Sequence, residues 1–292
     1  MTSVSAITGI VLNGLAIGML LLLVASGLSL IFGLMGVVNF AHGSLFMIGA
    51  YLGLVVFDST GVFFLALLVA PFFVAAIGIV MEFLTLRPLY GRDPLYQILL
   101  TFGIALILDE AVVLIWGPNA LSFATPSWAE GIFNVAGAAF PAYRLFVIAL
   151  GAVVAVGVYL FLQRTRYGLV VRAGTDNRTM AEASGVNVKR AFTIMFAVGA
   201  GMAAIGGVAA GPMMSAYPAM GTEMVIEAFV VVVIGGLGSF KGSVVGALLA
   251  GLTQSFGNFY VPEFSSIIIF ALMIAVLLVR PAGLFGTEGV EH

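Results

Sequence analysis

The chain has 292 residues, of which 62% are hydrophobic and only 8% are charged, and its formal net charge is −2. A soluble domain carries about 25% charged residues, so this composition excludes a water-facing surface and predicts that lipid surrounds most of the chain. Cysteine is absent, which excludes disulfides, thiolate nucleophiles and cysteine-based metal sites, and no basic patch suggests nucleic acid as a partner.

The N-terminal stretch MTSVSAITGIVLNGLAIG lacks the positively charged leader of a secretory signal, and the first charged residue of the chain is Asp58. We therefore expect the first apolar segment to be retained as a membrane helix.

Several stretches are apolar over the length that a membrane helix needs, which is about 20 residues. The candidate spans are 8–32, 62–85, 95–116, 143–163, 191–210 and 265–279, and three less regular apolar pieces are 43–57, 223–234 and 243–260. The first two of these pieces are short and the third is rich in glycine. Because lipid offers no hydrogen-bond partners to an open strand, the crossings should be helical. The sequence predicts an all-α polytopic membrane protein, a single domain over 1–292 with eight or nine transmembrane or partial helices.

The distribution of Lys and Arg predicts the orientation of the chain in the membrane. Basic residues are concentrated in 164–190, while Arg87 and Arg92 lie in the connection 86–94 and Arg280 follows the last span. The connection 117–142 has no Lys or Arg. Because cytoplasmic loops are enriched in these residues, the N-terminus is predicted outside and the C-terminus in the cytoplasm.

Two glycine-rich stretches predict an internal repeat. IFGLMGVVNFAHGSL, from Ile31, aligns with VIGGLGSFKGSV, from Val233, so that Gly36 falls on Gly238 and Gly33 on Gly235. The first copy leads to RPLYG at Arg87 and the second to RPAGLFG at Arg280. The predicted repeats cover 20–90 and 222–286 in the same orientation.

Each copy of the repeat predicts a broken membrane helix around Gly36 and Gly43 in the first and Gly235 and Gly238 in the second. Unwound backbone at membrane depth survives only within protein or beside a watery cavity, as in transporters with discontinuous helices. The alternative is that these glycines only permit close helix packing.

Polar side chains inside the spans are functional candidates because they are costly in lipid. Asn39 and His42 lie in the first predicted break, where each could line a pathway or bond backbone groups that the break sets free. The acidic pairs Asp109–Glu110 and Glu223–Glu227 could form a cation site, although carboxylates are also tolerated near the membrane interfaces.

Catalytic and nucleotide-binding motifs are missing from the sequence. No serine triad pattern, H-E-x-x-H or G-x-x-x-x-G-K-[ST] occurs, and GGLGSFKG is flanked by apolar sequence rather than built as a phosphate cradle. We therefore expect no catalytic residues, no metal site and no cofactor in this chain.

The longest polar stretch, 163–192, contains a predicted short helix over 177–184. Asp176 is expected to cap its start and Gly185 to end it. Such a helix between two spans suits docking of a soluble partner, and the alternative is an ordinary solvated loop.

Three motifs resemble a known family. GLMGVVNFAHGSLFMIGAYLG (Gly33–Gly53) closely resembles the signature of one permease subunit of the branched-chain amino-acid ABC importers, and VVVVIGGLGSFKGSVVGALLAG (Val230–Gly251) resembles its second signature. Ala181-x-x-x-Gly185 resembles the coupling loop of ABC importer permeases, although Ser184 and the early Gly185 depart from the usual motif.

The resemblance implies a multi-subunit importer in a bacterial inner membrane. Its expected partners are a second homologous permease, two cytoplasmic ATPase subunits that bind the ATP, and an extracytoplasmic substrate-binding protein. Asp176, Ala181, Glu182 and Gly185 would then couple the spans to the ATPases. The substrate stays open between leucine-like amino acids, other amino acids, urea or amides, and aromatic acids.

Two other functions are compatible with the residues alone. A self-contained channel could form where broken helices meet. An ion-coupled secondary transporter could use the acidic pairs to bind its coupling ion.

Overall fold

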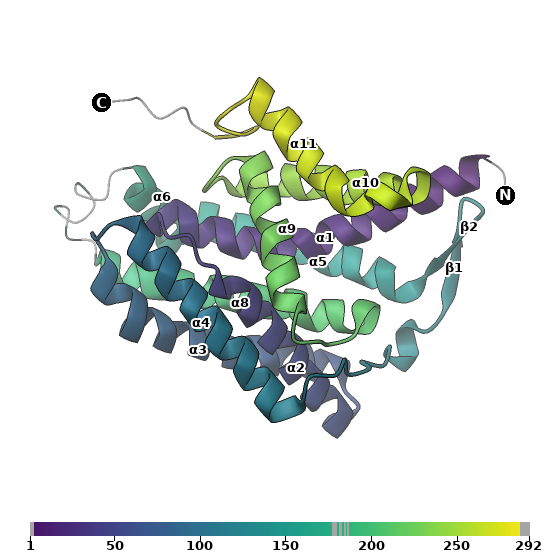
Figure 1. The fold of residues 1–292 in the computed structure, drawn as a ribbon, viewed down its shortest axis with the longest axis horizontal. Coiled ribbons are helices and arrows are strands. Elements are labelled where there is room, and N and C mark those ends of the chain that lie inside the picture. The colour runs from purple at the N-terminus through teal and green to yellow at the C-terminus, as the bar shows by residue number, and fades with distance from the viewer. Residues whose placement is uncertain (1–2, 177–179, 181–182, 184, 186, 287–292) are drawn as a thin grey trace.

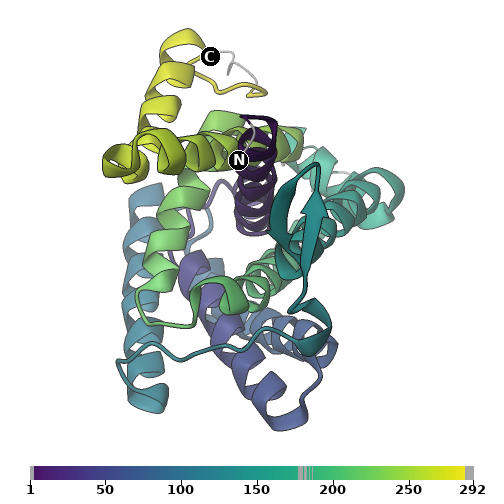
Figure 2. The same cartoon turned by 90° about the vertical axis from the view of Figure 1, so that its right-hand side faces the viewer.

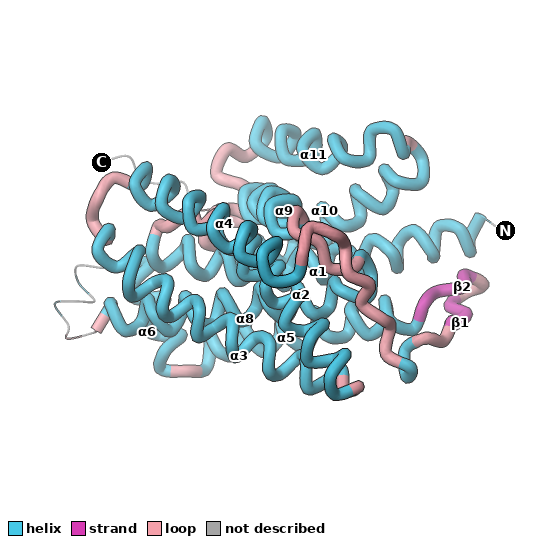
Figure 3. Tube along the Cα trace, turned by 60° about the horizontal axis from the view of Figure 1, so that its bottom comes forward, coloured by secondary structure: helices cyan, strands magenta, loops and turns pink. Residues whose placement is uncertain are grey.

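The computed structural model describes residues 3–176, 180, 183, 185 and 187–286. Helices make up nearly all of it, apart from the antiparallel hairpin of β1 (Ile132–Val135) and β2 (Ala138–Pro141) in the connection after α4 (Figures 1 and 3). The helices are α1 (Ser3–Met35), α2 (Ala41–Thr60), α3 (Phe63–Met81), α4 (Pro94–Trp116), α5 (Ala142–Arg164), α6 (Arg166–Asp176), α8 (Val188–Met214), α9 (Met220–Gly235), α10 (Phe240–Tyr260) and α11 (Ser265–Val279).

The predicted fold class is confirmed. Within the described ranges, six helices are long and apolar enough to cross a membrane, namely α1, α2, the α3 segment extended to Leu89, α4, α5 and α8. The pair α9–α10 is bent by 117° at a short break, and α11 is a shorter apolar helix. Together they account for the eight or nine transmembrane or partial helices that the sequence predicts.

The sequence predicts one span, α2, to be shorter than it is. The apolar piece 43–57 belongs to α2, whose 20 residues match the length of a membrane crossing. The glycine and polar residues that lower its hydropathy lie mainly on a buried surface, because α2 is buried from Ala41 to Tyr51. Contact with protein rather than lipid explains why this helix is less apolar than the others.

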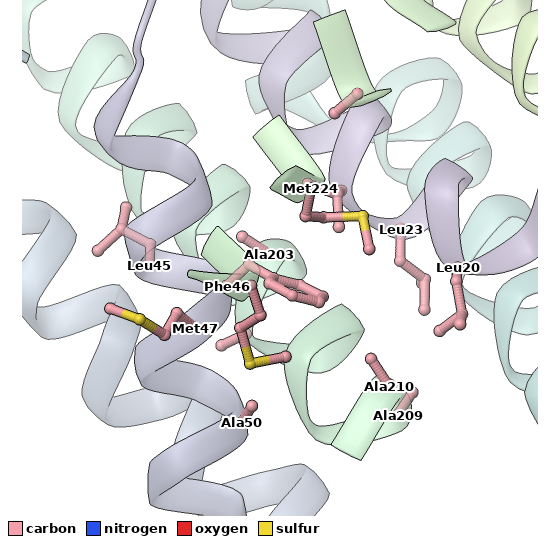
Figure 4. Packing of buried hydrophobic residues seen from close by; sticks show 14 of the residues in the cluster. Leu20, Leu23, Leu45, Phe46, Met47, Ala50, Ala203, Ala209, Ala210 and Met224 are labelled. Atoms are coloured by element: carbon pink, nitrogen blue, oxygen red, sulfur yellow. The ribbon is translucent and has the colours of Figure 1, made fainter. Parts of the chain in front are cut away.

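The buried centre of the molecule is built from α1, α2 and α8. Phe46 of α2 and Ala203 of α8 are fully buried, as is Leu23 of α1, and Figure 4 shows them in one cluster. By contrast, α3, α4, α5 and α11 expose large apolar side chains such as Phe72 and Leu114. These outer helices therefore present the surface that suits lipid or a membrane partner.

The two ends of the bundle differ in charge. The N-terminal end of α1 lies at one end, together with the β1–β2 hairpin (Figure 1). This hairpin belongs to the connection 117–142, which has no Lys or Arg. The Arg-rich helix α6 lies at the other end (Figure 1). This separation is the charge asymmetry on which the predicted orientation rests.

The axis of α9 crosses the directions of α1 and α10 (Figures 1 and 2). It packs on α1, α10 and α11 and also on α2, so it connects the N-terminal and C-terminal parts of the chain. The first predicted break lies between α1 and α2, and the second lies where the chain turns from α9 into α10.

Candidate functional site

The first break separates α1 from α2 between Met35 and Ala41. Gly36 has φ +65°, and its N–H donates to the Phe32 carbonyl at 2.7 Å, which closes the end of α1. A Cβ on Gly36 would meet nothing within 4 Å, so glycine is needed here for its backbone conformation and not for packing.

Thr101 of α4 bonds the backbone that this break sets free. The Phe40 N–H donates to Thr101 Oγ1 at 3.3 Å, and the Thr101 hydroxyl lies 3.3 Å from the Val38 carbonyl and 3.1 Å from the Ile98 carbonyl. Thr101 is fully buried. Sequence analysis missed it, because a single hydroxyl in an apolar helix gives no sign of which backbone groups it will meet.

Thr101→Val should destabilise the protein by about 1–3 kcal/mol, because valine preserves the shape but leaves the partly buried Phe40 N–H without a partner. The unfolding temperature in detergent micelles measures the effect. The matched control is Thr8→Val, since Thr8 is only partly buried and its hydroxyl donates to the Val4 carbonyl of its own helix. Equal stability of the two variants would contradict the assigned role of Thr101.

Asn39 and His42 do not bond the freed backbone groups, which corrects the sequence-based expectation. His42 is fully buried, and its Nε2 lies 3.0 Å from the carbonyl oxygen of Val24, well inside α1. Asn39 is also fully buried, and its amide atoms have no hydrogen-bond partner among the described residues. His42 therefore fixes α2 against α1, while contact of either side chain with substrate stays a prediction.

The second break lies between Gly235 and Phe240, and the C-terminal segment 280–286 covers it. Gly238 has φ +79°. The Leu284 N–H donates to the Ile234 carbonyl and the Phe285 N–H to the Gly235 carbonyl, both at 2.9 Å. The second break is thus bonded by the RPAGLFG motif that ends the second predicted repeat, whereas the first break relies on α4.

The last turn of α1, which leads into the first break, lies against the second break. A Cβ on Gly33 would lie 2.9 Å from the Gly238 carbonyl oxygen, so α1 and the second break touch through their backbones. Gly43 of α2 makes an even closer approach to Gly221 of α9, where a Cβ would lie 2.0 Å from the carbonyl oxygen. Gly235 similarly contacts the backbone of Gly242.

The candidate glycines therefore divide between the two interpretations that the sequence left open. Gly36 and Gly238, which the repeat alignment pairs, both have a left-handed backbone at their breaks. Gly43 and Gly235 instead permit close backbone contact, as small residues do at membrane helix interfaces.

The acidic residues have separate partners. Asp109 of α4 accepts from Ser44 of α2 at 2.7 Å and lies 3.5 Å from Thr222 Oγ1 of α9. Glu223 accepts from the Tyr217 hydroxyl at 2.6 Å, while Gln254 Nε2 of α10 donates to Glu227 at 3.3 Å. No group of three His, Cys, Asp or Glu in the described part of the chain could hold a metal ion.

Tyr217 lies in the connection between α8 and α9. Burial and the neighbouring Glu223 carboxylate raise the pKa of Tyr217 to about 12. The phenol therefore keeps its proton at neutral pH and remains the donor in this bond.

The predicted coupling loop is described only in part. Asp176 is the last residue of α6 as the structure describes it, and because residues 177–179 lie outside the described ones, its capping of a following helix stays a prediction. Most of the predicted helix over 177–184 lies outside the described residues, including Ala181 and Glu182. Gly185 is exposed with φ +81°, a conformation typical of a glycine just after a helix.

A cluster around the buried Glu82, just after the end of α3, contains an ion pair with Arg87 and a hydrogen bond from the beginning of α8, and sequence analysis did not identify it. Glu82 is fully buried and accepts from Arg87 Nη2 at 3.0 Å, from Tyr90 at 2.7 Å and from Thr193 of α8 at 2.8 Å. Because α8 begins directly after the predicted coupling loop, this cluster connects the loop to the 86–94 connection at the same end of the bundle.

Membrane-length helices interrupted by two breaks define a polytopic membrane protein of the permease class. The family model described as "Branched-chain amino acid transport system / permease component" matches residues 10–277. The chain belongs to this family, as its motifs predict.

Curated relatives agree over nearly the full length. The chain is 30% identical to the high-affinity branched-chain amino acid transport system permease protein BraD of Pseudomonas aeruginosa, with 96% of this chain and 95% of that protein covered. It is 30% identical to LivH of Escherichia coli, with the same shares covered. A probable LivH permease of Methanocaldococcus jannaschii is 28% identical, with 92% and 89% covered. No solved structure matches the chain significantly.

Proposed function

We propose that this chain is one permease subunit of an ABC importer and forms part of the translocation path for branched-chain or related amino acids. The observation that carries the proposal is the pair of helix breaks, with the end of α1 packed on the second break, within a chain that matches the permease family over residues 10–277. The names of BraD and LivH supply the substrate class.

Energy would come from two separate ATPase subunits, because the chain contains no G-x-x-x-x-G-K-[ST] motif for nucleotide. These subunits would dock at the Arg-rich end, which the positive-inside rule assigns to the cytoplasmic side of a bacterial inner membrane. A second homologous permease would complete the path, and an extracytoplasmic binding protein would deliver substrate at the end with the β1–β2 hairpin.

The direct test is reconstitution into liposomes together with a second homologous permease, the ATPase subunits and the binding protein that the proposal requires. We expect ATP-dependent uptake of labelled leucine by the complex and no flux through this chain alone. Flux through the chain alone without ATP would support a channel. Uptake that follows an ion gradient and is lost in Glu223→Gln or Asp109→Asn would support a secondary transporter.

Bulky residues in the coupling loop should separate ATP hydrolysis from transport. In Gly185→Trp and Ala181→Trp, we expect leucine uptake to fall to near background while the spans remain folded. The control is Gly91→Trp in the 86–94 connection, because Gly91 has φ +82° and, like Gly185, would meet nothing within 4 Å of an added Cβ. Normal uptake in the loop variants would count against docking there.

A further inference from the structure

A cavity of about 220 Å³ lies between α1, α8, α9 and α10. Its wall is mostly apolar, with Ile17 and Leu20 from α1, Met213 from α8 and Met224 from α9. Figure 4 shows the Met224 side chain extending from α9 toward α1, where Leu20 and Leu23 lie. Methionine is flexible, so such a wall adapts to aliphatic side chains that differ in branching.

The polar part of the wall is small and contains a single carboxyl group. Glu227 of α9 lines the cavity together with Gln254 and Asn258 of α10. Gln254 Nε2 donates to Glu227, while Gln254 Oε1 is buried and has no hydrogen-bond partner among the described residues. The cavity therefore holds a carboxylate and an unused carbonyl oxygen side by side, and both accept hydrogen bonds.

We propose that this cavity binds an aliphatic α-amino acid as it crosses the permease. Glu227 and Gln254 Oε1 accept from the ammonium group, the Asn258 amide donates to the carboxylate, and the methionine and leucine wall holds the side chain. The inference rests on the proposed function and adds to it the residues that select the substrate class.

The chemistry of the wall favours this ligand over a coupling cation. A metal ion in a protein takes several oxygen ligands, whereas only one carboxylate lines this cavity and most of its wall is apolar. An ammonium group attached to an aliphatic body matches both parts of the wall. Urea and amides have no aliphatic body to fill it.

The cavity adjoins two others toward the end of the bundle where the hairpin lies. Asn258 also lines a cavity of about 560 Å³ that includes Asn13 of α1 and Ala138 of β2. Met213 also lines a cavity of about 310 Å³ that includes Arg144. Substrate released at this end would therefore meet cavities that share lining residues with the proposed site.

The helix that carries Glu227 also leads to the second break. From Met224 and Glu227, α9 continues to Gly235, which contacts Gly242 at the turn into α10. A ligand in the cavity thus touches both arms of the bent pair, since Gln254 and Asn258 belong to α10. A change in the angle between α9 and α10 would alter the cavity directly.

The test uses the assembled transporter in liposomes with two measurements. One is ATP-dependent uptake of labelled L-leucine, and the other is crosslinking by photo-leucine, a leucine analogue with a diazirine in its side chain, followed by peptide mapping. We expect crosslinks at Met213, Met224 or Ile17. Glu227→Gln should raise the leucine concentration for half-maximal uptake about tenfold or more, because a charge-assisted bond to the ammonium is lost.

Two further variants sharpen the test. Met224→Trp should block photo-leucine crosslinking by filling the cavity. Glu223→Gln is the matched control, because Glu223 lies four residues earlier on α9, bonds Tyr217 and does not line the cavity. It should keep normal uptake and crosslinking. Excess 4-methylpentanoate, which is leucine without its amino group, should not compete with leucine.

The outcomes separate the two proposals. Leucine uptake that is normal in Glu227→Gln and Met224→Trp, or crosslinks that map elsewhere, would overturn the cavity assignment and leave the permease function intact. If the wild-type complex takes up no leucine but the cavity is labelled, the proposed import function fails and the site stands. Absence of both overturns both.

Discussion

Gly43→Leu is expected to prevent α2 from packing on α9 and to leave little folded protein. A Cβ at this position would lie 2.0 Å from the Gly221 carbonyl oxygen and 2.8 Å from Val225 Cβ. Neither helix can yield at a backbone contact without moving as a whole, so the cost should exceed that of an overpacked side chain, on the order of 4 kcal/mol or more. That is a large fraction of the 5–15 kcal/mol that typically stabilises a domain.

The measurements are the yield of monodisperse protein in detergent and its unfolding temperature. Gly103→Leu is the control, because Gly103 is also a helical glycine in a span, on α4, but an added Cβ would meet nothing within 4 Å. Gly43→Ala should already lower the unfolding temperature well below that of Gly103→Ala. If the Gly43 and Gly103 variants behave alike, the α2–α9 contact does not hold the breaks in place.

The sequence predicts the spans well for a physical reason. Lipid requires long apolar helices, so α4 and α5 follow almost directly from hydropathy, with ends within one residue of those expected. The exception is α2. Because this helix lies inside the bundle, it can carry the polar His42 and several glycines. These residues lower the hydropathy of α2, so hydropathy alone predicts only the short piece 43–57.

The site could be predicted only where the backbone itself determines it. Gly36 and Gly238 have the left-handed conformations that helix breaks require, which agrees with their alignment as a repeat. Contacts between distant segments leave no such trace. Thr101 meets Val38 across 63 positions of sequence, and no local pattern connects them.

Glu82→Ala is expected to loosen the start of α8 and to reduce transport strongly. It removes the shared acceptor of Arg87, Tyr90 and Thr193. Breaking a buried ion pair typically costs 3–5 kcal/mol. Because the Arg87 side chain remains 27% exposed, water can partly solvate the charge left behind, and we expect a loss of about 3 kcal/mol.

The comparison with Glu82→Gln distinguishes charge from hydrogen bonding. Glutamine keeps an oxygen that accepts from Tyr90 or Thr193, so this variant should lose less stability than alanine while still lacking the ion pair. Unfolding temperature in detergent and leucine uptake by the reconstituted complex should both rank wild type above glutamine and glutamine above alanine. Asp93→Asn is the control, since Asp93 accepts only the exposed Leu95 N–H at the start of α4.

The position of the cluster predicts a specific defect. Thr193 lies on the second turn of α8, close behind the coupling loop, and Glu82 links it to the end of α3. A movement of the loop would therefore reach α3 through Glu82 as well as along α8. Partial restabilisation of Glu82→Ala by lower temperature should restore the folded spans but not the uptake that accompanies ATP hydrolysis. If uptake returns in proportion to folded protein, Glu82 serves stability alone and the link to the loop has no part in transport.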